Sequence, residues 1–206
     1  SDTPRPGNAK FKKLTPVDPN STNPYQLTEA DRTVIGNTTP KFSGGFGLNA
    51  TYKGFDMSMF FNFMYDFDVL NANKIMLTTW ADNKENNFLM DIASDKRWRN
   101  FDDMGNEIRY SPEVLAEFNK NATMWNPTSI GRPICMSYAV EDGSFLRLNS
   151  ATLGYTLPSV WTKKVGLSKV RFYVSGNNLF TLTGYSGYDP EVNIATGLTP
   201  NIDYNR

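Results

Sequence analysis

Apolar and polar residues alternate along residues 42–52 and 55–65, which Lys53 and Gly54 separate. The apolar set is Phe42, Phe46, Leu48, Ala50 and Tyr52, followed by Phe55, Met57, Met59, Phe61, Phe63 and Tyr65. Alternation with a period of two is the pattern of a β-strand with one apolar face. A two-residue turn would place Tyr52 opposite Phe55 and bring both sets to the same face. The sequence therefore predicts a β-hairpin that is apolar on one side only.

The predicted strands are long. Each arm has 11 residues and at roughly 3.3 Å per residue spans about 36 Å, whereas strands of soluble domains average about 5–6 residues. A tilted strand that crosses a bilayer needs about 9–11 residues. The alternation returns in residues 145–157 and 170–182. Four such strands present an apolar face of roughly 700 Å², which is larger than the ~300–600 Å² patch of a soluble monomer, so lipid or a second sheet must cover it.

One stretch departs from the alternation. Leu146, Arg147, Leu148 and Asn149 are out of phase with the apolar positions that follow them. Because they lie at one end of their strand, we interpret them as residues at the membrane interface, where the strand leaves the hydrocarbon.

Composition excludes several functional classes. The 206 residues carry 21 basic and 21 acidic side chains, so the charge balance gives no support for binding nucleic acid. The chain has no His, and its single cysteine is Cys135, which leaves no internal disulfide and no Cys/His cluster for zinc. No apolar run is long enough to predict a transmembrane helix, whereas alternating transmembrane strands would escape a hydropathy search.

The connections between the predicted strands alternate between short and long, as in bacterial outer-membrane barrels, which have short periplasmic turns and long extracellular loops. The sequence therefore predicts an all-β fold, an antiparallel transmembrane β-barrel segment of about four long strands with long extracellular loops. Ser111 and Pro112 predict a short loop helix through Phe118. The expected division is an extracellular loop (1–40), a barrel hairpin (41–66), an extracellular insertion (67–144), two further barrel strands with a periplasmic turn (145–182) and an extracellular loop (183–206).

Several motifs, in one order along the chain, resemble the C-terminal barrel portion of SusC/RagA-family TonB-dependent transporters of Bacteroidota. They are DRTVIGN (31–37) with PKF (40–42), YKGFD (52–56), DGSFLRL (142–148), TLGYTLP (152–158), NNLFT (177–181) and GYDPE (187–191). The match spans nearly the whole chain, and residues 67–140 are its least similar part.

The resemblance implies a much larger protein of the cell outer membrane. Its barrel would have about 22 strands in contact with outer-membrane lipid and would enclose an N-terminal plug, so that this chain is a fragment that stops before the final strand. The implied activity is import of oligosaccharides, or of peptides in some members. The implied partners are a SusD-like lipoprotein and the TonB complex, which would act through the missing N-terminal region.

A calcium-loop spacing occurs near the N-terminus. Asp18, Asn20 and Thr22 occupy alternate positions and Glu29 is twelfth from Asp18, as in the ligand set of a calcium loop. Asn23 replaces the usual glycine, so an ordinary loop rich in Pro and Asn is the alternative. The sequence indicates no other cofactor.

No arrangement of residues predicts an enzyme. A hydrolase needs a positioned base or a pair of carboxylates, but the chain lacks His and its acidic residues are scattered. We expect Asp189 and Glu191 to order their loop. Residues 45–50 match the dinucleotide pattern GxGxxA, but they lie inside a predicted strand with no helix after it.

Aromatic residues of the predicted outer loops are the candidate contacts for a ligand or partner. Trp80, Trp98 and Trp125 lie in the insertion, and Tyr185 and Tyr188 follow the last strand. Their rings could stack on sugars or anchor a partner protein, and a small apolar core within the loops is the alternative. Two functions remain open, namely a transporter barrel wall and a soluble β-sandwich binding module at the cell surface.

Overall fold

The structure, a computed structural model, divides the chain into two compact units. The sheet unit is Gly36–Leu70 with Val140–Asp203, and the insertion unit is Ser1–Ile35, Asn71–Ala139 and Tyr204–Arg206. No helix among the described residues is long and apolar enough to cross a membrane. The described residues are 5–17, 20, 22, 26–79, 88–92, 95–129, 134–192 and 202–203.

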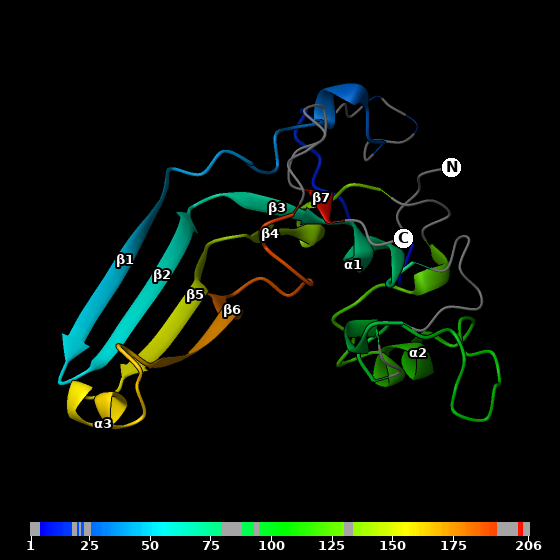
Figure 1. The fold of residues 1–206 in the computed structure, drawn as a ribbon. Coiled ribbons are helices and arrows are strands. Elements are labelled where there is room, and N and C mark those ends of the chain that lie inside the picture. The colour runs from blue at the N-terminus through cyan, green and yellow to red at the C-terminus, as the bar shows by residue number, and fades with distance from the viewer. Residues whose placement is uncertain are drawn as a thin grey trace. The chain divides into compact units, whose positions relative to one another are not determined.

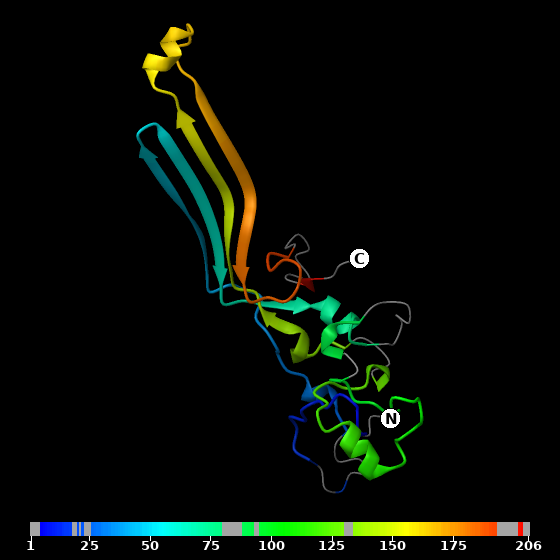
Figure 2. The same ribbon diagram turned by 90° about the horizontal axis from the view of Figure 1, so that it is seen from below.

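A four-stranded antiparallel sheet forms most of the sheet unit, with strand order β1-β2-β5-β6 (Figures 1 and 2). Its strands have 11 to 13 residues each, about twice the usual length in soluble domains. Their bounds are β1 Phe42–Tyr52, β2 Phe55–Tyr65, β5 Phe145–Thr156 and β6 Arg171–Thr183. The prediction of four long antiparallel strands is confirmed.

The register of the first hairpin is the predicted one. Tyr52 pairs with Phe55, and every apolar position of β1 faces one of β2, out to Phe42 opposite Tyr65. Lys53 and Gly54 both have positive φ, 44° and 91°, as a type I′ two-residue turn requires. The turn therefore sets the register that the alternation predicted.

A register shift explains the break in the alternation of β5. Phe60 of β2 pairs with Ser150, but the next residue, Phe61, pairs with Leu148, so that Asn149 is one extra residue in β5. An extra residue of this kind is a β-bulge. Odd-numbered positions of β5 face the apolar side after the bulge, and even-numbered positions face it before the bulge. Leu148 therefore stays on the same face as Phe61. The sequence explanation, a strand end at the interface, missed this bulge.

β6 carries a second register shift. Ser150 pairs with Asn177 but Leu148 with Phe180, so β6 has one more residue than β5 over this interval. Asn178, in the middle, has a φ of 50°, which Asn tolerates better than most residues. Relative to β2, β6 thus has two extra residues. Because two is an even number, even-numbered positions of β6 lie on the apolar face on both sides of the shift. The alternation of β6 consequently remained visible in the sequence.

A small second sheet, with strand order β4-β3-β7, extends the β2 and β5 pair beyond the long-loop end. The bounds are β3 Asp68–Asn71, β4 Val140–Asp142 and β7 Ile202–Asp203. At the junction of the two sheets lies a buried core of Phe67, Val69, Phe145 and Tyr185. A Cβ at Gly143 would lie 2.6 Å from both Phe67 and Val69, so this core requires glycine there.

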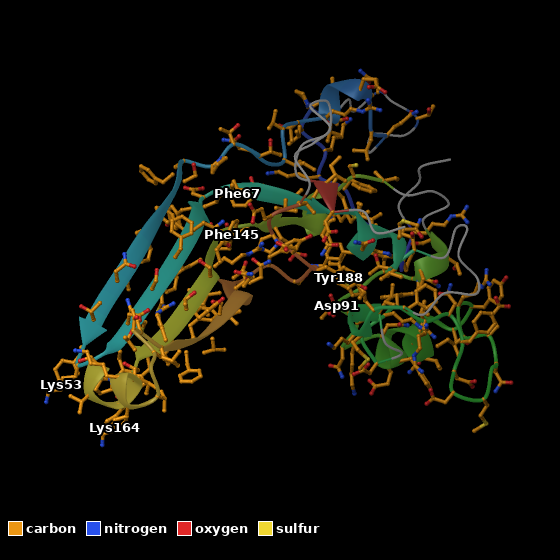
Figure 3. All side chains as sticks on the ribbon, in the orientation of Figure 1. Lys53, Phe67, Asp91, Phe145, Lys164 and Tyr188 are labelled. Atoms are coloured by element: carbon orange, nitrogen blue, oxygen red, sulfur yellow. The ribbon has the colours of Figure 1, made fainter. Side chains whose placement is uncertain are left out.

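The two ends of the sheet differ in their connections. Lys53, in the β1–β2 turn, and Lys164, in the short connection between β5 and β6, mark one end, while Phe67 and Phe145 mark the other (Figure 3). The β5–β6 connection contains helix α3, Ser159–Lys164. All long connections leave from the opposite end, as the sequence indicated.

The insertion unit combines two segments that the sequence predicted to be separate loops. Asn126 N donates to Gly7 O at 2.8 Å, and the Trp98 ring lies directly against Gly7. The helices among the described residues of this unit are short: α1 Ala72–Met76, α2 Pro112–Phe118, and the 3-10 turns η1 Glu29–Asp31, η2 Met90–Ile92, η3 Pro127–Ser129 and η4 Ser137–Ala139. The predicted helix after Ser111 is α2, with Pro112 in its first turn.

Candidate functional site

One face of the four-stranded sheet, here called the apolar face, exposes large apolar side chains. Leu48 is 51% exposed near the middle of β1, and Val174 is 66% exposed in β6. Rings stack between neighbouring strands: Phe46 on Phe61 with centroids 5.0 Å apart, and Phe55 near Tyr155 at 4.4 Å. Within the sheet unit, no described residue forms a second sheet over this face. A β-sandwich would need such a sheet.

The opposite face, here called the polar face, carries an ion pair at its short-connection end. Arg171 donates through Nε to Asp56 Oδ1 at 3.0 Å and through Nη2 to Asp56 Oδ2, so the pair links β6 to β2 across β5. The β5 residue between them is Gly154. A Cβ there would lie 2.4 Å from Arg171 Nη2 and 2.6 Å from Asp56 Oδ2. Glycine is therefore needed at position 154 to leave room for the pair.

A second cluster of charges lies on the polar face toward the long-loop end. Arg147 of β5 donates through Nε to Thr181 Oγ1 at 3.1 Å. Its guanidinium also forms ion pairs with Asp189 and, at 3.0 Å, with Glu191 Oε2. The Arg147 side chain is only 13% exposed. The acidic residues that were expected to order their loop thus bind it to a strand of the sheet.

Between these two clusters the polar face is small and neutral except for one ring. The Phe60 ring lies over Gly45 of the neighbouring strand β1, where an added Cβ would lie 2.8 Å from Phe60 Cζ. Gly45 and Gly47 belong to the GxGxxA pattern, which lies inside β1 as expected. Asn62 Oδ1 is buried on the same face and has no hydrogen-bond partner among the described residues.

The two tyrosines after β6 occupy opposite environments. Tyr185 is 6% exposed in the core, and its hydroxyl donates to Asp203 Oδ2 at 2.7 Å. Burial and this carboxylate raise the pKa of the Tyr185 hydroxyl above its usual range. Contact between a ligand and Tyr185 would require the core to open. Tyr188, labelled in Figure 3, is 81% exposed and is available for contact.

The tryptophans of the insertion are partly buried. Trp98 packs on Gly7, and Trp125 meets the Tyr138 ring edge-on with centroids 5.0 Å apart. The indole Nε1 atoms of both tryptophans are buried and lack a hydrogen-bond partner among the described residues. These contacts favour the alternative of a small core within the insertion. The third candidate, Trp80, lies outside the described residues.

The calcium-loop residues are only partly described. Asp18 lies outside the described residues, and Asn20 and Thr22 are exposed. Glu29 pairs with Arg32 at 2.8 Å. Within the part of the chain that the structure describes, no group of three or more His, Cys, Asp or Glu side chains could hold a metal ion.

A different carboxylate organises this segment. Asp31 accepts hydrogen bonds from the backbone N of Leu14, Thr15 and Thr28, and Lys13 Nζ lies 3.6 Å from its Oδ2. The backbone bonds from Thr15 and Thr28 hold the pKa of Asp31 well below its usual range. Asp31 therefore closes the loop between residues 15 and 28.

Comparison with known proteins identifies the family. The chain is 36% identical over 168 residues to TonB-dependent receptor P3 of Formosa agariphila, an alignment that covers 82% of the chain and 14% of that protein. The chain belongs to the TonB-dependent receptor family. It is also 27% identical over 175 residues to TonB-dependent receptor P39 of the same organism, with 84% of the chain and 15% of that receptor covered. No family model matches the chain.

Solved structures share the fold. The RagAB peptide importer in its closed-closed state matches with a TM-score of 0.62 and 23% identity, covering 87% of this chain and 17% of that chain. Its open-open state gives a TM-score of 0.60 at 24% identity. The comparisons confirm the resemblance carried by the motifs, and a family of receptors agrees with the expectation that the chain is not an enzyme. This TonB-dependent receptor chain spans 14–15% of the length of its Formosa relatives.

Two features of the site were not predicted from the sequence. The pairs Asp56 with Arg171 and Arg147 with its two carboxylates each join residues far apart in the chain. The only signal for these pairs in the sequence was the presence of charged residues at the polar positions of strands in which apolar and polar residues alternate. A charge there has to be paired or hydrated, but the pattern does not tell which partner it finds.

Proposed function

We propose that the four-stranded sheet is part of the barrel wall of an outer-membrane TonB-dependent importer of the SusC type. The observation that carries this proposal is the contrast between the faces of strands long enough to cross a bilayer. Large apolar side chains are exposed on one face, which suits lipid, while the other carries ion pairs and small polar residues together with the rings of Phe60 and Tyr173, which suits a hydrated lumen.

The proposed cargo is an oligosaccharide or a peptide, received with a SusD-like lipoprotein. TonB would supply energy through the rest of the receptor. The name TonB-dependent receptor, borne by the relatives, supports the energy source, and the likeness to RagAB, a peptide importer, supports a peptide as one class of cargo. A calcium ion near residues 18–29 remains a proposal that depends on Asp18.

Sidedness tests the barrel wall directly. A membrane-impermeant amine reagent applied to intact cells should label Lys96 and Lys120, which are exposed in the insertion unit, and should spare Lys53 in the short β1–β2 turn. Lys53 should react only after the outer membrane is permeabilised, because short turns of outer-membrane barrels lie on the periplasmic side. Labelling of Lys53 in intact cells, with the two insertion lysines spared, would invert the topology.

Alanine replacements test recognition by the outer aromatic residues. Tyr188→Ala should weaken ligand binding by about 1–2 kcal/mol and thereby reduce uptake. The yield of folded barrel should not fall, because the exposed ring contributes contact area for a ligand and does not support the fold. Uptake is measured as growth on a panel of oligosaccharides and peptides. Tyr110→Ala, at an equally exposed ring of the insertion unit, is the control.

The tryptophans distinguish the two roles of the insertion. If Trp98 and Trp125 form a loop core, their alanine variants should reduce receptor yield in the membrane. If they contact the ligand or the lipoprotein, yield should hold while uptake falls, and Trp80→Ala should do the same.

A further inference from the structure

The loop after β6, residues 184–192, is held on its N-terminal side by packing and hydrogen bonds. Tyr185 is buried and bonded to Asp203, as described above. The backbone N and Oγ of Ser186 donate to the two carboxylate oxygens of Glu141 at 2.9 and 2.8 Å. Gly187 lies against the Tyr185 ring, where a Cβ would come within 2.4 Å. This side of the loop is therefore bound to the small sheet.

The C-terminal side of the same loop is held by Arg147. Asp189 and Glu191 both pair with its guanidinium, and Glu191 N donates to Asp189 Oδ1 at 2.8 Å. Pro190 between them is buried and has a restricted backbone. Arg147 is itself held by the sheet, through Thr181 of β6. The Arg147 side chain thus connects the four-stranded sheet to the loop.

Tyr188 lies between these two attachments and is the exposed large side chain of the loop. A ring on a loop that is fixed on both sides loses little conformational entropy when it binds. Without Arg147, two carboxylates would remain close together with no cation between them and would repel each other. The N-terminal attachment does not involve Arg147 and would remain.

We propose that Arg147 is the positioning residue for Tyr188, so that the DGSFLRL and GYDPE motifs act as one device that holds an aromatic contact at the mouth of the barrel. The proposal rests on the proposed function for the role of Tyr188 in recognition. The positioning itself is independent of that role and can be measured without a ligand.

The experiment uses the full-length receptor in outer membranes, with a nitroxide attached at Tyr188→Cys in a Cys135→Ser background, because Cys135 is exposed and would also react. Arg147→Gln should release the loop and make the label tumble faster by roughly twofold or more. Arg171→Gln removes the same chemistry at the other end of the polar face and should leave the label unchanged.

Two further variants separate a specific attachment from a general loss of structure. Asp189→Asn with Glu191→Gln should mobilise the label as much as Arg147→Gln, and all three changes together should add nothing further. Arg147→Lys keeps the charge but replaces the planar guanidinium, which can bind both carboxylates, with a single ammonium group. The label should therefore be immobilised only in part.

Cleavage gives a second measurement on the unlabelled receptor. Chymotrypsin applied to intact cells should cut after Tyr188 about tenfold faster in Arg147→Gln, because cleavage requires local opening of the loop. Label mobility and cleavage that both match the parent receptor would overturn the inference. Faster motion together with unchanged uptake in Tyr188→Ala would support the positioning by Arg147 and overturn the recognition role of Tyr188.

Discussion

The apolar and polar faces of the four-stranded sheet are built from the same strands but are stabilised differently. On the apolar face, cross-strand neighbours such as Phe46 and Phe61 stack in pairs, and Phe46 remains exposed while Phe61 is half-buried. On the polar face, side chains reach across whole strands, as Arg171 does to Asp56 over Gly154. One face depends on the medium around it, and the other depends on specific partners within the protein.

This difference predicts how each face responds to substitution. On the apolar face, substitution by another apolar side chain should be tolerated, and a charged side chain should lower the stability of the folded barrel. On the polar face many small or polar residues should be tolerated, but the positions that give room to an ion pair should not.

The largest effect is expected for a charge on the apolar face. Met59→Arg, near the middle of β2, should destabilise the folded barrel by about 2–4 kcal/mol, because the guanidinium would lie in hydrocarbon. The loss is measured as a lower unfolding temperature in the heat-modifiability assay on gels. Ser58→Arg, at the adjacent exposed position of the polar face, is the matched control and should be nearly neutral. Equal effects of the two changes would show that the faces are not lipid and lumen.

A smaller effect is expected when the space for the ion pair is filled. Gly154→Ala should cost about 1 kcal/mol in the same assay, since its Cβ would push aside the flexible ends of Arg171 and Asp56 and separate the pair. In a background that carries both Arg171→Ala and Asp56→Ala the cost should nearly vanish, because both obstructing side chains are gone. Gly184→Ala is the control, as nothing lies within 4 Å of the added Cβ. If Gly154→Ala costs the same with and without these two side chains, the ion pair is not the reason that position 154 is glycine.

The smallest effect is expected for the ion pair itself. The Asp56 and Arg171 side chains are each about one-third exposed, so water screens the pair, and its coupling should be the smallest of the three effects and should weaken with added salt. A double-mutant cycle of Asp56→Asn and Arg171→Gln measures it. A coupling that does not change between low and high salt would mean that the pair is shielded from the lumen.

The sequence predicted those parts of the fold that follow from period-two alternation and a short turn. The pairing of Tyr52 with Phe55 extends without interruption to Phe42 and Tyr65, because both the turn type and the apolar face demand one register. The bulge at Asn149 was missed, because an extra residue breaks the alternation without any signal of its own. In β6 the pattern survived because two extra residues leave the parity unchanged.

The site residues were predicted less well, because residue type alone does not distinguish a contact from a core. Tyr185 and Tyr188 are three positions apart in one loop, yet one is buried and the other exposed. The difference arises from Phe67, Phe145 and Asp203, which are distant in the chain. The packing of Gly7 against Trp98 likewise joins the N-terminal segment to the insertion, and no local pattern foretold it.

The register shifts in β5 and β6 also determine where the gene can lose a single codon. At Asn149 the ladder is already interrupted, so loss of that one residue would leave Leu148 opposite Phe61 and the faces unchanged. The same loss between Leu153 and Tyr155, where the ladder is continuous, would exchange the two faces of the strand on one side of the deletion. Loss of single residues among related receptors should therefore be tolerated best at positions equivalent to 149 and 178.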